Sequence, residues 1–306
     1  MKVTNLSSIF AKSFITAALF AFITFIPVLS NADQHYGIGS EGLKAGTVPG
    51  PGFYYLMYNN YYTSDTMTDS SGDDSNIGFD ISVIANVNRF VYITDKKILG
   101  ADYGFQLIVP FVYTDLEIKA AGVDDDDFSL SDITVEPLIL SWHGAQYDAV
   151  FGTALFVPTG EYDKNSSVNI GQDHYTVMLS QGITYYIGEG KGWNISYIAR
   201  YEKHLENRDL DITYGDDFSV DWGIGKTINK FYDIGLIGYS HWQVTDDDGD
   251  DAAADSVKDQ VHAIGLEAGV FFPDNSFGVK VKYQNEFYAE DRAKGHSFWI
   301  DIVKPF

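Results

Sequence analysis

The chain has 306 residues, with 43 acidic against 20 basic side chains, a formal net charge of −23 and no cysteine. Such an acidic chain repels nucleic acid, which excludes a nucleic-acid partner, and the lack of cysteine excludes disulfides, thiolate metal sites and thiol nucleophiles. The 21 tyrosines, 21 phenylalanines and 29 glycines, against 8 prolines, are a composition typical of strands and turns.

The N-terminus has the pattern of a secretory signal. Lys2 and Lys12 precede an apolar run from Phe14 to Leu29, and small residues follow up to Ala32. We expect a signal peptide over residues 1–32, cleaved after Ala32. A membrane anchor is the alternative, but the run is shorter than the roughly 20 residues that a spanning helix needs. No later stretch is long and apolar enough for such a helix, so any membrane crossing must use strands.

Residues 33–51 form a polar segment rich in glycine and proline, which ends in "AGTVPGP" and is followed by "GFYY". Pro49 and Pro51 have no N–H to donate, so they keep this segment from extending the ladder of the strand that follows. The segment is too polar to cross lipid and too short to be a domain. We therefore expect a periplasmic or plug segment, ahead of a barrel over residues 52–306.

From residue 52 onward, apolar and polar residues alternate. In "HYTVMLSQGITYY", for example, Val177 and Leu179 share one face, while Thr176 and Ser180 share the other. Period two predicts strands. The predicted strands cover roughly 52–62, 77–93, 99–114, 130–142, 148–157, 173–187, 192–204, 216–228, 231–244, 259–272, 277–289 and 295–306.

The connections between these strands alternate between short turns and long acidic loops, the latter around 63–76, 115–129, 158–172, 205–215, 245–258 and 290–294. Most segments reach the 9–11 residues of a tilted transmembrane strand. The pattern predicts an all-β fold, an antiparallel up-and-down transmembrane barrel of about twelve strands with short periplasmic turns and long extracellular loops. The chain ends in an alternating strand closed by Phe306, the expected C-terminal signal for the barrel assembly machinery. A soluble β-sandwich is the alternative.

In such a barrel the polar face of each strand lines the lumen. Mid-strand polar residues are therefore candidates to line it: Asp80, Asn86, Gln106, Glu136, Arg200, Glu202, Asp221, Glu267, Lys280, Lys282, Gln284 and Glu286. Tryptophans near predicted strand ends are candidates for interfacial girdles: Trp193, Trp222, Trp242 and Trp299.

Two kinds of chemistry receive little support. The acidic stretches Val123–Asp132 and Thr245–Asp259 suggest calcium, but the second fails the EF-hand spacing at its first position, Val244. We expect solvated loops, with no metal site and no cofactor.

No hydrolase or nucleotide-binding motif is present, and neighbours such as His296 and Ser297 point to opposite faces. His174 and His241 stay open as bases of a barrel lipid hydrolase.

Three stretches, Gly42–Asp65, Ile98–Phe111 and Ala154–Asp163, resemble the outer-membrane family named for the meta-pathway of phenol degradation. The resemblance rests on the N-terminal motif Gly46, Pro49, Pro51, Gly52 and Tyr54, and on "VPTG" after the fifth strand. It implies a signal-bearing outer-membrane barrel that admits hydrophobic, often aromatic, compounds.

Together these features lead us to expect a non-enzymatic channel in the outer membrane of a Gram-negative bacterium. It would take up small hydrophobic compounds passively, with Asp33–Gly52 as its gate and lipid and lipopolysaccharide as its surroundings. The alternatives are a non-transporting surface barrel with interaction loops and, less favoured, an outer-membrane lipid hydrolase.

Overall fold

The computed structural model describes residues 34–253 and 258–306; the predicted signal peptide, residues 1–32, and Asp33 lie outside the described residues. The strands are β1 (Gly52–Ser64), β2 (Phe79–Ile98), β3 (Ala101–Ile118), β4 (Val123–Leu130), β5 (Ile133–His143), β6 (Tyr147–Val157), β7 (Thr176–Ile187), β8 (Trp193–His204), β9 (Asp217–Ile228), β10 (Tyr232–Gln243), β11 (Gln260–Phe272), β12 (Phe277–Glu290) and β13 (His296–Pro305). Short 3₁₀ turns, η1 (Glu189–Lys191) and η2 (Pro273–Asn275), lie between β7 and β8 and between β11 and β12. Among these residues no helix has the length and apolar character to cross a membrane.

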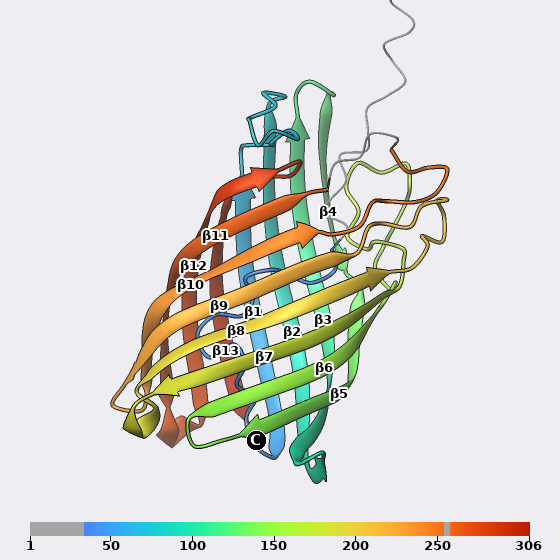
Figure 1. The fold of residues 1–306 in the computed structure, drawn as a ribbon. Helices are drawn as coiled ribbons and strands as arrows, with labels where there is room; N and C mark the ends of the chain where they lie inside the picture. The colour runs from blue at the N-terminus through green and yellow to red at the C-terminus, as the bar shows by residue number, and fades with distance from the viewer. Residues whose placement is uncertain (1–33, 254–257) are drawn as a thin grey trace, which may run out of the picture. The chain divides into compact units, whose positions relative to one another are not determined.

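The strands form a closed ring of twelve antiparallel strands, as predicted (Figure 1). Each pairs with its neighbour in the chain, except that β3 pairs with β5, and β1 closes the ring by pairing with both β2 and β13. The closing seam runs from Tyr54 opposite Pro305 to Thr63 opposite His296. Closure matters physically because it leaves no open edge of unpaired backbone groups, which hydrocarbon cannot satisfy.

The thirteenth strand, β4, corrects the prediction of a loop over 115–129. β3 continues to Ile118, and β4 pairs back onto it from Ile118 opposite Val123 to Phe111 opposite Leu130. The run of four aspartates, Asp124–Asp127, suggested a solvated loop because aspartate is depleted in strands. Pairing with β3 overrides that preference in a hairpin that extends beyond the ring.

The two ends of the ring differ as predicted (Figure 1). Short connections join β2 to β3, β5 to β6, β7 to β8, β9 to β10 and β11 to β12 at one end, the short-turn mouth. β1 begins and β13 ends there too. The longer connections, including those between β6 and β7 and between β8 and β9, lie at the other end, the long-loop mouth.

The outer face of the ring is apolar and the inner face is largely polar. On β7, the outward Val177 and Leu179 are 41% and 46% exposed, while the inward Thr176 and Thr184 are fully buried. Most other strands follow the same alternation, which matches a wall in contact with hydrocarbon, but β2 is an exception, with Asp80 and Asn86 on its outer face.

The tryptophan prediction is only half right. Trp193 and Trp242 lie at opposite ends of their strands, on the outer face. Trp222 is in the middle of β9, so it cannot belong to a girdle. Trp299 points inward, where it is 6% exposed and donates from Nε1 to Oε1 of Gln284 at 3.0 Å. The predicted strand 216–228 already has Trp222 at its middle, so the girdle prediction for Trp222 was wrong on its own bounds. Period two puts Trp299 on the same face as Asp301.

Candidate functional site

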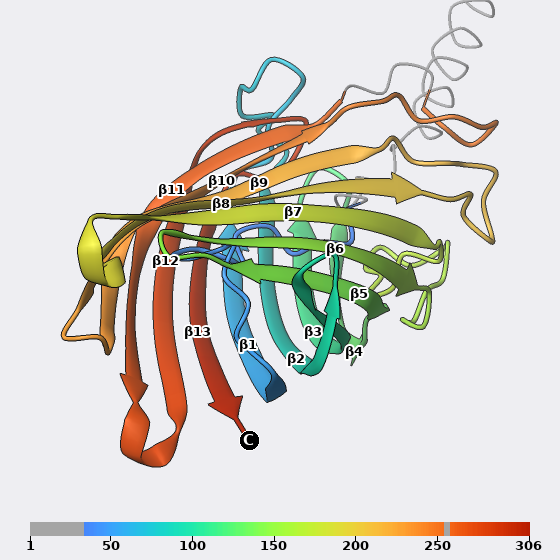
Figure 2. The same cartoon turned by 60° about the horizontal axis from the view of Figure 1, so that its bottom comes forward.

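Residues 34–51, here called the lumen segment, run through the inside of the ring. At the long-loop mouth, Nε2 of His35 lies 2.9 Å from a carboxylate oxygen of Asp132. At the short-turn mouth, Oγ1 of Thr47 donates to a carboxylate oxygen of Asp148 at 3.1 Å. Between these points the segment bonds to strands all round the ring, which only an internal path allows (Figures 1 and 2).

The backbone of the lumen segment is held by carboxylates on the inner wall. Four of its N–H groups donate to three such side chains: Tyr36 to Glu202 at 3.0 Å, Gly39 and Glu41 to Asp221 at 3.1 Å each, and Leu43 to Glu267 at 3.0 Å. All three acceptors are buried. Because a buried donor without an acceptor costs about 1–3 kcal/mol, these bonds fix the register of the segment.

The central charge of the lumen segment is Glu41. Its carboxylate lies 2.9 Å from Nη1 of Arg89 and 3.8 Å from Nη2 of Arg200, on opposite sides of the ring. Burial alone would raise the pKa of Glu41, but Arg89 and Arg200 lower it to about 2. The segment thus carries the counter-charge for two inward-pointing arginines.

Lysines bind the segment as well. Nζ of Lys282 forms an ion pair with Asp301 at 3.1 Å and donates to the backbone carbonyls of Gly39 and Ser40. Lys44, on the segment itself, pairs with Asp233 of β10 at 2.8 Å. The segment therefore completes a charge network on the wall.

Apolar residues of the inner wall are also covered by the lumen segment. Ala45 and Val48 pack into a cluster of wall residues: Val91, Ile93, Ile139, Val150 and Ile198. Tyr36 and Ile38 cover a second patch with Phe156 and Met178. The inner face is therefore amphipathic beneath the segment, unlike the uniformly polar wall expected of a water-filled pore.

The fit is tight enough at one glycine to predict a mutational effect. A Cβ on Gly46 would lie 2.3–2.5 Å from backbone atoms of Ile183 on β7. Because a strand backbone in a closed ring cannot retreat, we expect Gly46→Ala to displace the segment and raise the single-channel conductance in planar bilayers. Gly50→Ala is the matched control, since a Cβ there meets nothing within 4 Å. Equal conductance in the two variants would contradict this packing.

Ten of the twelve predicted lumen candidates point inward: Gln106, Glu136, Arg200, Glu202, Asp221, Glu267, Lys280, Lys282, Gln284 and Glu286. Asp80 and Asn86 are corrections. Both lie on the outer face of β2, because Arg89 fixes the odd-numbered positions of that strand as inward. Asp80 is exposed, and Asn86 donates to Asn59 at 2.7 Å on the outside of the ring.

Several residues that the docked lumen segment depends on were not among the predicted candidates, above all Arg89, Glu41 and Asp301. Arg89 could have been predicted from the sequence, because it is the only basic residue in the middle of β2 and shares a face there with Val91 and Ile93. Glu41 had no such signal, since its role depends on two strands that are distant in sequence.

The motif residues lie where the lumen segment turns into β1. Pro49 and Pro51 are exposed at the short-turn mouth, and the hydroxyl of Tyr54 donates to the carbonyl of Gly50 at 2.9 Å. Gly52 has a φ of 155°, which glycine tolerates well. Phe306 lies beside the same strand: its N–H donates to the carbonyl of Phe53 at 3.0 Å.

Histidines gather at the long-loop mouth. His174, just before β7, and His204, at the end of β8, are buried, and Nε2 of His174 lies 3.1 Å from Nδ1 of His204. Burial, together with His35 and His204, lowers the pKa of His174 to about 3. His241 is also buried and bonds to Asp259 at 3.1 Å. His174 and His241 both face inward, away from the lipid that a hydrolase would act upon.

A closed ring with an apolar outer face, unequal mouths and an internal segment defines this protein as an outer-membrane β-barrel. The family model described as "Putative MetA-pathway of phenol degradation" matches residues 64–302, and the chain belongs to that family. No curated protein matches the chain.

A solved structure shares this fold. The chain is similar to the COG4313 outer membrane channel from Pseudomonas putida F1, with a TM-score of 0.76 at 15% identity, over 85% of this chain and 97% of that one. Looser similarities include the translocator domain of autotransporter NalP from Neisseria meningitidis, with a TM-score of 0.49 at 9% identity over 83% of this chain and 89% of that one. The NanC porin has a TM-score of 0.44 at 10% identity over 82% and 100% of the two chains.

Proposed function

We propose that this barrel is a passive outer-membrane channel for small hydrophobic compounds, and that the lumen segment is its gate. The observation that carries the proposal is the amphipathic inner wall beneath the segment. Ile93, Ile139 and Ile198 line the lumen, where a channel for hydrophilic solutes would place polar groups.

Displacing the segment would expose these apolar patches together with the carboxylates that bind its backbone. An apolar solute could then occupy the positions of Ala45 and Val48, while water reached Glu202, Asp221 and Glu267. The same wall can hold the gate or the solute, so the two compete for it. The similar channel from Pseudomonas putida F1 and the phenol-pathway family agree with such a role.

The surroundings follow from the location. We propose that the apolar outer face contacts membrane lipid, that the acidic outer loops face lipopolysaccharide, and that the barrel assembly machinery reads the strand ending in Phe306. No catalytic role is part of this proposal.

Uptake measurements test the function. A strain that lacks the gene is complemented with the full chain or with an empty vector. The initial uptake of labelled hydrophobic compounds is then compared with that of small hydrophilic sugars. We expect the full chain to raise only hydrophobic uptake. Equal uptake of every compound with and without the protein would overturn the proposal and favour a surface barrel that transports nothing.

A selective variant sharpens the test. Ile198→Asn places a polar side chain on the wall under Ala45, and we expect it to reduce hydrophobic uptake. Ile195→Asn changes the same residue type on the outer face of the same strand, where it is 46% exposed, and controls for strand stability.

A further inference from the structure

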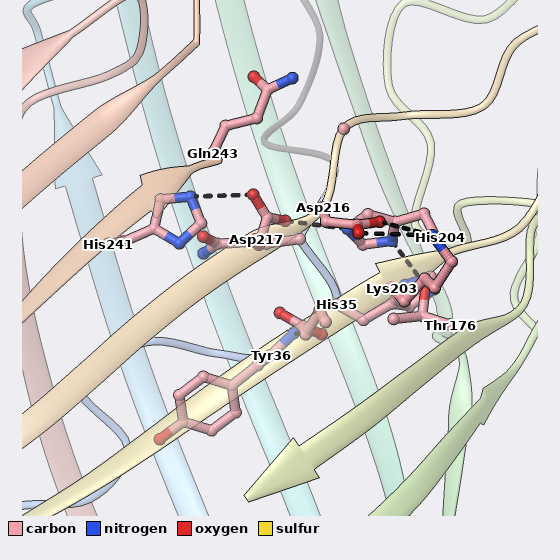
Figure 3. Close-up of polar contacts among 12 residues, drawn as sticks. His35, Tyr36, Thr176, Lys203, His204, Asp216, Asp217, His241 and Gln243 are labelled. Atoms are coloured by element: carbon pink, nitrogen blue, oxygen red, sulfur yellow. Dashed lines mark hydrogen bonds and ion pairs between the residues drawn. The ribbon is translucent and has the colours of Figure 1, made fainter. Parts of the chain in front are cut away.

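Three histidines converge at the long-loop mouth, although they lie far apart in sequence. His35 belongs to the lumen segment, His174 lies two residues before the start of β7, and His204 ends β8. One ring nitrogen from each lies within 4.8 Å of those of the other two. All three side chains are buried. Figure 3 shows His204 between Thr176 and Asp217, with His35 nearby.

The outer nitrogen of each ring faces an acceptor. Nε2 of His35 lies 2.9 Å from Asp132, Nδ1 of His174 lies 3.0 Å from the backbone carbonyl of Gln172, and Nε2 of His204 lies 2.9 Å from Asp217. A carbonyl or carboxylate oxygen accepts hydrogen bonds, so we assign the protons to these three nitrogens.

The inner nitrogen of each ring then carries a lone pair, and these lone pairs point at one another. Nδ1 of His35 and Nδ1 of His204 lie 2.8 and 2.7 Å from the hydroxyl of Thr176, which has a single proton to donate. Nε2 of His174 faces Nδ1 of His204 at 3.1 Å, and with the protons assigned to the outer nitrogens none lies between them. Two of these lone pairs share the one proton of Thr176 and the third, on His174, faces His204, an arrangement that a cation completes.

We propose that His35, His174 and His204 bind one divalent transition metal ion of the zinc class, which fastens the outer end of the lumen segment to the barrel wall. Tetrahedral zinc with Zn–N bonds of about 2.0–2.1 Å needs ligand nitrogens roughly 3.3 Å apart. The pair at 3.1 Å already meets this spacing, and the set within 4.8 Å closes by small rotations of the rings. The hydroxyl of Thr176 or a water molecule fills the fourth position.

The groups behind the ligands suit the same ion. Metal-binding histidines typically donate their second N–H to a carboxylate or a backbone carbonyl, and all three histidines here do so. Asp132 brings a negative charge beside the ion, and Asp217 accepts from Nε2 of His204. Imidazole ligands favour zinc, copper or nickel over calcium and magnesium, which prefer oxygen.

The neighbouring acidic group has its own cation. Asp217, His241 and Asp259 also converge, but Nη1 of Arg292 lies 3.1 Å from Asp259. This group is an ion-pair network that supports His204 through Asp217. The proposal therefore concerns one metal ion and goes beyond the channel function, since the site would bind metal whether or not a solute passes.

The test measures metal binding by the purified full chain in detergent, without a polyhistidine tag and after chelator treatment. Zinc is titrated against a chromophoric chelator, and cobalt serves as a spectroscopic substitute that reports tetrahedral geometry. We expect one ion per chain with a dissociation constant of about 1 µM or tighter. Hydrogen exchange of residues 34–47 should slow when zinc is added.

Variants separate this site from adventitious binding. His35→Ala lies outside every strand and leaves the ring intact, and we expect it to weaken zinc binding by at least about tenfold; Asp132→Asn should weaken it by a similar factor. His296→Gln, an exposed histidine on the outer face, is the matched control and should bind like the parent chain. Binding weaker than about 100 µM, or unchanged affinity in His35→Ala, would overturn the proposal.

Discussion

Deleting residues 34–46 is expected to raise the single-channel conductance in planar bilayers several-fold. The ring would survive the deletion, because its twelve strands pair only with one another and the first begins at Gly52. What the deletion removes is the material inside the ring: four backbone bonds to wall carboxylates and the apolar side chains over the inner patches. Conductance should rise because water and ions fill that path.

The control for this deletion is the integrity of the barrel. Heat-modifiable migration in gels should show the same folded band for the deleted chain and the full chain. A folded deletion variant with unchanged conductance would mean that the lumen segment does not limit flow. In that case the constriction would lie in the wall itself, and the gate would have to be sought elsewhere.

Sequence alone predicted the ring because the strand period and the turn pattern are local signals. Apolar and polar residues alternate along a strand, as Val177 and Thr176 do in β7. The connections are short at one mouth and long at the other. Closure then follows, because open edges are not tolerated in a membrane. β4 was not predicted because four consecutive aspartates, Asp124–Asp127, disfavour a strand. Only the pairing with β3 stabilises β4 as a strand.

The interior was less predictable, because its contacts join residues that no local pattern relates. Period two placed Glu202 and Lys282 on the inner face, yet it failed in β2, where Asp80 and Asn86 share a face with apolar residues. The partners of the lumen segment depend on how the chain threads through the ring. Glu41 meets Arg89 and Arg200 only after closure, and the histidine cluster combines positions 35, 174 and 204.

Neutralising Glu41 is expected to open the channel nearly as far as the deletion does. Glu41→Gln removes the carboxylate that lies between Arg89 and Arg200 and leaves two cations facing each other across the lumen. Breaking a buried ion pair costs about 3–5 kcal/mol, and the lower end applies here because the solvent reaches part of the side chain. About 3 kcal/mol shifts the balance between docked and displaced segment roughly a hundredfold. Bilayer recordings should show long open periods that the parent chain lacks.

The pH dependence of the parent chain tests the same ion pair without mutation. The pKa of Glu41 falls from an ordinary value of 4.5 to about 2 when the segment is docked. A depressed pKa means that the charge stabilises docking fully above about pH 4.5, and that this stabilisation is lost as the pH falls toward 2. Open probability should therefore be flat at neutral pH and rise below about pH 4.5 in the parent chain. Glu41→Gln should show no such rise, whereas Glu206→Gln, in an exposed loop, should behave like the parent. If Glu41→Gln keeps the same acid response, then another group holds the segment in place.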